Sequence, residues 1–219
     1  RGRLKICCPK GRVSSTLTLG TRSFMKKIIL ASASPQRQEL FKKLGLEFSV
    51  EPSNFDEDTI TIAEPEKLAR ALALAKAKAV AGKTMDAVVV GADTIVVLGD
   101  NIFGKPRDHA HATAMLAKLN GNTHSVITGI ALYDADSHRF VTDAVETKMS
   151  FIQVSHQEIE AYVQSGEPFG KAGGYAIQGL GAFLVKEIEG DYYNVIGLPI
   201  SALAVRLSEF GIPHNFSGS

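Results

Sequence analysis

The sequence predicts an α/β fold, in which a mixed twisted sheet with flanking helices forms two lobes around a cleft. Strand-like and helical segments alternate through the first half of the chain, which is typical of a sheet covered by helices on both faces. The run from Asp86 to Asp93 is apolar between its two acids, as in a strand buried on both faces. Two long strand-like segments, 125–133 and 139–151, then follow each other as an antiparallel hairpin.

We expect one domain over residues 25–219, preceded by a basic leader over residues 1–24. The 219 residues are enough for a sizeable core, and 45% hydrophobic with 21% charged residues is ordinary for a globular protein. The leader holds six basic residues and no acid, so 18 of the 24 basic residues remain against 23 acids, a net charge of −5 for the rest. This mildly acidic domain argues against nucleic acid as a partner, and no apolar run is long enough to span a membrane.

The leader is rich in Ser and Thr, and its composition resembles an organelle transit peptide. The alternatives are a disordered tail, a segment added by cloning, or a start assigned too early, with Met25 as the true start. Both cysteines, Cys7 and Cys8, lie here, so the domain has no disulfide and no cysteine nucleophile. A reducing compartment fits this usage, and we expect a cytoplasmic protein unless residues 1–24 direct it to an organelle.

The first pair of elements is a strand from Lys27 that leads into a helix with apolar residues at helical spacing. Ser34 is a natural N-cap, and Pro35 suits the first turn, where its missing N–H costs nothing. The turn carries Ser32, Ser34 and Arg37 at the positive end of the helix dipole. These features are those of a phosphate site, although a well-capped turn without a ligand explains them equally well.

The middle of the chain continues the alternation. We expect a strand over 46–50, an acidic loop over 54–58, a helix over 64–83, a strand over 86–93 that continues through 94–98, and a helix over 108–119. After the hairpin, Ser155 and Glu158 form a capping box that opens a helix ending at Gln164. A glycine-rich stretch over 166–181, strands over 182–187 and 193–196, and a helix from Pro199 through Phe210 complete the chain.

Two carboxylates are candidates for chemistry. Asp93 ends an apolar strand, and ligands of open α/β sheets bind beyond the carboxyl ends of the strands. Glu57 lies in an acidic loop, which alone indicates a solvated segment, but with Asp93 it could complete a site for Mg²⁺ or Mn²⁺. The histidines show no spacing typical of a zinc site.

Several cations could clamp phosphates. Lys76 by itself predicts a solvated helix face, whereas Lys105 and Arg107 follow a glycine on a loop and are better placed to reach a ligand. Lys171 lies in a similar glycine-rich setting. Gln178 offers both a donor and an acceptor and could read the edge of a base, although a turn residue is the simpler interpretation. The P-loop, the dinucleotide fingerprint and the Gly-x-Ser-x-Gly elbow do not occur.

Taken in order, these segments resemble the Maf family of nucleotide pyrophosphatases over about Lys26 to Gly211. Each matching piece is modest, but the ordered set is very specific. The pieces are Leu30-Ala31-Ser32-Ala33-Ser34-Pro35 with Arg37, Glu57, Lys76, Gly91-Ala92-Asp93-Thr94, Gly104-Lys105-Pro106-Arg107-Asp108, Ser165-Gly166-Glu167-Pro168, Lys171-Ala172-Gly173-Gly174-Tyr175, Ile177-Gln178-Gly179 and Gly190-Asp191-Tyr192-Tyr193-Asn194-Val195-Ile196-Gly197-Leu198-Pro199.

The resemblance implies hydrolysis of nucleoside triphosphates to monophosphate and pyrophosphate with a divalent metal, by an enzyme that is usually a homodimer. It also implies a fold like that of inosine-triphosphate pyrophosphatases. The residues that it assigns fall into three groups. Ser32, Ser34 and Arg37 would hold the triphosphate, and Lys76 and Lys105 would neutralise it. Glu57 and Asp93 would hold the metal and position the water, with Asp93 as the base. The remaining residues of the substrate site would be Gln36, Thr94, Arg107, Lys171 and Gln178.

Within the family, Asp93-Thr94 and Ile177-Gln178-Gly179 resemble the branch that acts on dTTP and UTP in a house-cleaning role. That branch usually has Arg at the position of Gln36, so this chain lacks one permanent charge and one bidentate donor. Two other functions stay open at this point. The chain could be a non-catalytic nucleotide-binding regulator of cell division and septation, or a pyrophosphatase for purine nucleotides such as ITP or modified GTP.

Overall fold

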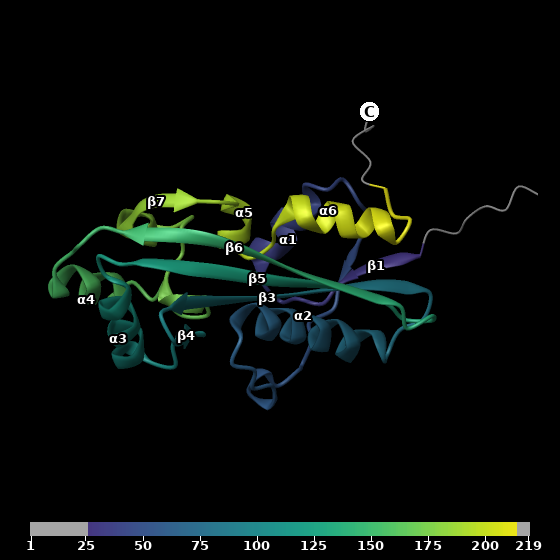
Figure 1. Cartoon of the computed structure of the whole chain (residues 1–219), viewed down its shortest axis with the longest axis horizontal. Helices are drawn as coiled ribbons and strands as arrows, with labels where there is room; N and C mark the ends of the chain where they lie inside the picture. Colours follow the sequence, from purple (N-terminus) through teal and green to yellow (C-terminus); the bar gives the residue numbers. More distant parts are fainter. Residues whose placement is uncertain (1–25, 214–219) are drawn as a thin grey trace, which may run out of the picture.

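In the computed structural model, which describes residues 26–213, the chain forms a seven-stranded mixed sheet with helices on both faces (Figure 1). The strand order is β2-β1-β3-β5-β6-β7, and β4 pairs with β3 outside this path. The strands are β1 (Lys27–Leu30), β2 (Ser49–Val50), β3 (Ala87–Leu98), β4 (Asn101–Phe103), β5 (Thr123–Asp134), β6 (Phe140–Phe151) and β7 (Val185–Glu189). The prediction of a mixed sheet flanked by helices is therefore confirmed, whereas the leader predicted over residues 1–24 lies outside the described residues.

The described residues also form six α-helices and three short 3₁₀ helices. They are α1 (Pro35–Lys42), η1 (Glu57–Thr59), α2 (Pro65–Ala81), α3 (His109–Leu119), α4 (His156–Gln164), η2 (Ala172–Gly174), η3 (Leu180–Leu184), α5 (Tyr192–Ile196) and α6 (Ile200–Glu209). In Figure 1, α2 lies on one face of the sheet and α1, α5 and α6 on the other, while α3 and α4 pack together at one end. Three of these helices begin where the sequence predicts: Ser34 caps α1, Asp108 caps α3, and Ser155 with Glu158 forms the capping box of α4.

The strand β3 runs through the centre of the sheet, and one of its edges is interrupted. Along one edge it pairs with β5 continuously from Val88 to Val97. Along the other edge β1 pairs with residues 87–90 and β4 pairs with residues 96–98. Within the described residues, Gly91–Ile95 therefore has no partner strand on that side. We call these five residues the β3 gap. At this gap the middle of a buried strand lies next to the loop after β1 and the loop after β4.

Three local predictions are wrong. Residues 193–196 form part of α5 rather than a strand, because Asp191 caps the N–H groups of Tyr193 and Asn194 and Gly197 ends the helix with a φ of 115°. The strand expected over 182–187 begins only at Val185, after η3.

The strand expected over 46–50 shrinks to the two residues of β2. Leu46 and Phe48 pack against the core instead, with the ring of Phe48 against the ring of Phe41 of α1 (centroids 4.6 Å apart), whereas Val50 is exposed.

The helix α2 approaches the sheet unusually closely. Most of its buried residues are alanines, and the strands below it carry Gly91 and Gly129. A Cβ at Gly91 would lie 2.1 Å from the carbonyl oxygen of Ala73, and one at Gly129 would lie 2.2 Å from that of Ala69. Real Cβ atoms essentially never come so near, so only glycine fits at both positions. This contact sets the depth at which the side chains of α2 enter the sheet.

Asp134 ties the start of β1 to the β5–β6 hairpin, and this makes stability depend on pH. Its Oδ1 accepts hydrogen bonds from Lys26 Nζ (2.6 Å) and from the N–H groups of Asp136 and Ser137 (both 3.0 Å). Burial alone would raise the pKa of Asp134, but these donors outweigh it and lower the pKa from 3.8 to about 2. A carboxyl with a depressed pKa stabilises the fold above its unfolded pKa, and this contribution disappears as the pH falls through the folded value.

We therefore expect Asp134→Asn to lower the free energy of unfolding at pH 7 by about 2 kcal/mol. The difference in the free energy of unfolding between the variant and wild type should shrink as the pH falls from about 4 towards 2. Urea unfolding at each pH measures this difference. Asp100→Asn, at the exposed β3–β4 turn, is the matched control. A difference that is as large at pH 2.5 as at pH 7 would contradict this role for the carboxylate.

Candidate active site

A cavity of about 580 Å³ lies at the β3 gap, between the carboxyl end of β1 and the loop after β4. Because the gap exposes one edge of β3, side chains from both faces of the strand reach the cavity. All the predicted site residues except Arg107 line it, together with several that the sequence did not single out. The predicted lining residues are Ser32, Ser34, Gln36, Arg37, Glu57, Lys76, Asp93, Thr94, Lys105, Lys171 and Gln178.

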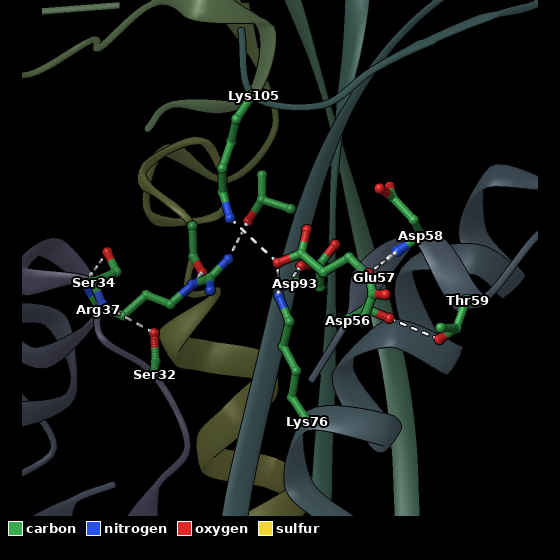
Figure 2. A network of polar contacts seen from close by, with 12 residues as sticks. Ser32, Ser34, Arg37, Asp56, Glu57, Asp58, Thr59, Lys76, Asp93 and Lys105 are labelled. Atoms are coloured by element: carbon green, nitrogen blue, oxygen red, sulfur yellow. Dashed lines mark hydrogen bonds and ion pairs between the residues drawn. The ribbon is translucent and has the colours of Figure 1, made fainter. Parts of the chain in front are cut away.

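Lys76 is at the centre of the charged groups. It enters from α2 and is 7% exposed, so its prediction as a solvated helix face is wrong. Its Nζ donates to Glu57 Oε1 at 2.8 Å and forms a buried ion pair with Asp93 Oδ1. Lys105 Nζ reaches the same Glu57 oxygen from the opposite side at 3.2 Å (Figure 2). Two carboxylates and two ammonium groups are thus held together in one network.

The charges of this network keep Glu57 ionised. Burial alone would raise the pKa of Glu57, but the hydrogen bonds and charges of Lys76 and Lys105 outweigh it, so its pKa lies below the ordinary value. Glu57 belongs to η1, where Asp56 accepts a hydrogen bond from the N–H of Asp58 and so holds the turn. A solvated acidic loop would leave this carboxylate free, whereas here two lysines fix it over the cavity.

Asp93 reaches the cavity by a route that differs from the predicted one. The sequence placed it at the end of a strand, but β3 continues to Leu98 and Asp93 lies in its middle. The parallel partner β1 stops at Leu30, opposite Val90, so the sheet ends there on one side while β3 continues. Asp93 faces α2 and Lys76, and the next residue, Thr94, faces α1, because successive side chains of a strand point to opposite faces.

The turn after β1 is both a capped helix start and a wall of the cavity. Ser34 Oγ accepts from the N–H of Arg37 (3.4 Å) and donates to Gln36 Oε1 (3.1 Å), while Ser32 Oγ accepts from the N–H of Ser34 (3.2 Å). Ser32 and Ser34 thus line the cavity at the N-terminus of α1. Gln36 contributes an amide there in place of a second guanidinium.

Arg37 is anchored from two elements. Its Nε donates to the carbonyl of Gly197 at 2.8 Å, and its Nη2 donates to Thr94 Oγ1 at 2.9 Å. Burial lowers the pKa of Arg37, although the charges of Asp93 and Glu57 act in the opposite direction. An arginine starts from so high a pKa that it stays charged at neutral pH. The guanidinium is therefore a fixed positive charge at the wall of the cavity.

A buried chain of hydrogen bonds behind Thr94 was not predicted from the sequence. Thr94 Oγ1 bonds Thr128 Oγ1 (2.9 Å), and Thr128 donates to the carbonyl of Asn194 (3.0 Å). Asn194 in turn donates through Nδ2 to Val126 O (3.0 Å) and to Thr147 Oγ1 (2.9 Å). The chain joins β3, β5, β6 and α5, and it holds the residue that orients Arg37. Its members are far apart in the sequence, so no local pattern reveals it.

The opposite wall comes from the glycine-rich stretch. Lys171 and Gln178, which the sequence predicts to contact the substrate, line this wall together with Glu167 and Tyr175. Tyr175 is buried and bonds His124 Nε2 through its hydroxyl at 2.8 Å. Burial lowers the pKa of His124 to about 4, so this imidazole is neutral at neutral pH and supports Tyr175 without adding a charge.

Arg107 lies apart from the other predicted site residues. It does not line the cavity; it is exposed, and its backbone N–H donates to His111 Nδ1 at 3.3 Å. The structure thus separates it from Lys105, two positions earlier in the same loop. Lys105 points into the cavity, whereas Arg107 precedes the N-cap of α3.

Two carboxylates with a lysine between them can take part in binding a hard cation. Among the described residues, no group of three or more His, Cys, Asp or Glu side chains is arranged so that it could hold a metal ion by itself. Mg²⁺ needs only one or two protein carboxylates when phosphate oxygens and water supply the other ligands. The hydrogen bonds of the described residues use one oxygen of Glu57, through Lys76 and Lys105, and one oxygen of Asp93, through Lys76. The donor set therefore fits a cation that arrives with a phosphate ligand.

Comparisons with known proteins show which proteins this chain is similar to. The family model described as "Maf-like protein" matches residues 27–210. A dTTP/UTP pyrophosphatase of Moorella thermoacetica is 48% identical over 188 residues, which cover 86% of this chain and 97% of that protein. Proteins of the same name from Desulforamulus reducens (48% identical, 86% and 98% covered) and Geotalea uraniireducens (47% identical, 84% and 95% covered) are similar to it as well. Within residues 26–213, no helix is both long and apolar enough to cross a bilayer.

Proposed function

This chain belongs to the family of Maf-like proteins, and we propose on that basis that it is a nucleoside triphosphate pyrophosphatase acting on dTTP, UTP or modified pyrimidine nucleotides. The products are the nucleoside monophosphate and pyrophosphate. The observation that supports this reaction best is the network of Asp93, Glu57, Lys76 and Lys105 beside Arg37 in one cavity. It combines carboxylates that can handle water with cations that can hold a polyphosphate.

The cations bind and neutralise the triphosphate. Lys76 and Lys105 stand on opposite sides of Glu57, and Arg37 is fixed in the first turn of α1 by the carbonyl of Gly197 and the hydroxyl of Thr94 (Figure 2). The hydroxyls of Ser32 and Ser34 add hydrogen bonds at the N-terminus of α1, where the helix dipole favours an anion. Because phosphoryl transfer depends mainly on positioning and charge stabilisation, these fixed cations carry much of the catalysis.

Asp93 is the general base. The oxygen of a water molecule attacks the α-phosphorus of the substrate and forms a new P–O bond. The bond from the α-phosphorus to the oxygen that bridges it to the β-phosphate breaks, and pyrophosphate leaves. Asp93 takes the proton of the attacking water, while Lys76 keeps the carboxylate in place through Oδ1. Glu57 and Asp93 would hold Mg²⁺ or Mn²⁺ together with phosphate oxygens and water, and the metal would supply charge neutralisation and a lower pKa for bound water.

The opposite wall recognises the base. Gln178 presents an amide that can donate to a carbonyl oxygen of uracil or thymine and accept from the ring N–H. Lys171 and Thr94 complete the substrate contacts, and Gln36 provides an amide where a second arginine would have stood. Arg107 does not line the cavity, so this proposal gives it no substrate contact. The homodimer expected from the resemblance and the cytoplasmic location expected from the cysteine usage stay predictions.

The test is release of pyrophosphate from a panel of nucleotides. We expect UTP and dTTP to be hydrolysed faster than ITP, ATP and GTP, with loss of activity in EDTA and recovery on addition of Mg²⁺ or Mn²⁺. Preference for ITP or a modified GTP would assign the chain to purine nucleotides instead. Nucleotide binding by the folded protein without any pyrophosphate release would contradict the enzymatic function and favour a regulatory one.

A further inference from the structure

The loop that carries Gln178 lies outside the sheet, yet it is held firmly. Gln178 itself is exposed, and it lies between Ala176 and Gly179, whose backbone groups are bonded to each other at 3.3 Å. The N–H of Ala176 donates to the hydroxyl of Tyr162 of α4 at 3.2 Å. On the other side of Gln178, the N–H groups of Leu180 and Gly181 donate to the side chain of Glu167, each at 2.8 Å.

Glu167 uses both carboxylate oxygens for this contact. Oε2 accepts from Leu180, while Oε1 accepts from Gly181 and from the hydroxyl of Tyr162 at 2.9 Å. Leu180 begins η3, whose N-cap residue, Gly179, supplies no side-chain hydrogen bond. Glu167 therefore satisfies the first N–H groups of η3 from a position more than ten residues earlier in the chain.

The fit around this carboxylate is tight. A Cβ at Gly179 would lie 2.1 Å from Glu167 Oε2, and a Cβ at Gly181 would lie 2.6 Å from the hydroxyl of Tyr162. Two glycines beside Gln178 thus allow Glu167 and Tyr162 to approach the backbone directly. In the conformation that makes these contacts, Gln178 lies in the wall of the cavity.

A carboxylate is unexpected in a cavity that binds a polyanion. Burial alone would raise the pKa of Glu167, but the N–H groups of Gly181 and Leu180 and the hydroxyl of Tyr162 outweigh it, so its pKa lies below the ordinary value. Its negative charge would repel a phosphate, yet its oxygens are occupied by the loop and the charge of Lys171 also acts on it. The role that remains for Glu167 is to fix the loop.

We infer that Glu167 is a positioning residue for base recognition, one that holds Gln178 at a set distance from the residues that bind the triphosphate. This inference rests on the proposed function, in which Gln178 contacts the base. It predicts that weakening the hydrogen bonds of Glu167 raises the Kd of a nucleotide and leaves the Kd of a bare polyphosphate unchanged. A purely structural role for Glu167 would affect both.

The experiment compares two probes by calorimetry in the presence of Mg²⁺: the non-hydrolysable nucleotide α,β-imido-UTP and inorganic tripolyphosphate. Glu167→Gln keeps the size of the side chain but turns an NH₂ group towards one of the two N–H donors. We expect it to raise the Kd of α,β-imido-UTP about tenfold and to change the Kd of tripolyphosphate less than about twofold. Glu160→Gln, on the exposed face of α4, is the matched control and should bind both probes like wild type.

Equal losses for both probes, or no loss for either, would overturn the inference. If Glu167→Gln does not fold, Tyr162→Phe removes the hydroxyl that bridges Glu167 and Ala176, and it should show the same selective loss at smaller size. Binding does not require turnover, so these outcomes are separate from the proposed function. Wild-type protein that binds both probes but releases no pyrophosphate from UTP would refute the enzymatic function and leave the role of Glu167 measurable.

Discussion

Replacing Asp93 by asparagine is expected to lower kcat/KM for UTP by about 10²–10⁴-fold, the contribution typical of a general base. The amide has nearly the size of the carboxylate but cannot take a proton from water. Lys76 keeps Glu57 as an ionic partner at 2.8 Å, so the buried ammonium is not left without a counter-charge. We therefore expect the variant to fold and to bind nucleotide while its turnover is lost.

Steady-state pyrophosphate release and thermal unfolding measure these two effects on the same protein. Asp100→Asn is the matched control, because Asp100 is an exposed residue of the β3–β4 turn in the same stretch of chain. It should leave kcat/KM and the unfolding temperature unchanged. Near-normal turnover by Asp93→Asn would show that another group accepts the proton, and Glu57 would then be the next residue to change.

The second large effect is expected on replacing Gly91, a residue without a side chain. Gly91→Ala would place a Cβ 2.1 Å from the carbonyl oxygen of Ala73, so α2 must move away from β3. We expect the free energy of unfolding to fall by about 1–3 kcal/mol, as for other overpacked cores. Because Lys76 lies on α2 between Ala73 and Ala77, its shift away from Asp93 should lower kcat/KM as well.

Gly82→Ala is the control for this change. Gly82 follows α2 with a φ of −63°, and its added Cβ would meet only the carbonyl of Lys78, at an ordinary distance of 3.5 Å. Its stability should remain within about 0.5 kcal/mol of wild type. Urea unfolding and activity assays compare the two variants, and a Gly91→Ala protein with the stability and activity of wild type would mean that α2 lies farther from the sheet than described.

Much of the fold was predictable from local patterns. The caps at Ser34, Asp108 and Ser155 fixed the starts of three helices, and unbroken apolar character identified β3 as a buried strand. Asp191 and Gly197 were equally good helix signals, but the apolar residues between them favoured a strand over 193–196. Residues of a five-residue helix and of a short strand have similar composition, so the cap was the better guide.

The sequence predicts which residues line the candidate site better than it predicts the contacts that they make. Ser32, Arg37 and Asp93 stand beside recognisable elements, and the cavity contains all three. Lys76 was different, because a lysine among alanines has the pattern of a solvated helix face. Its burial depends on glycines in two strands that are distant from it in the sequence, and on two carboxylates that offset the cost of removing its charge from water.

The β3 gap has a consequence for how the sheet meets other chains. An unpaired strand edge exposes N–H and C=O groups on which a foreign strand can align, which is a common route to aggregation. Here β1 and β4 close the gap at both ends and leave only the five residues Gly91–Ile95 between them. A foreign strand could pair over these five residues at most, because β1 and β4 block its extension at both ends, and charged side chains line the opening. The fold can therefore keep backbone groups open to a small ligand in the middle of its sheet without offering a template for polymerisation.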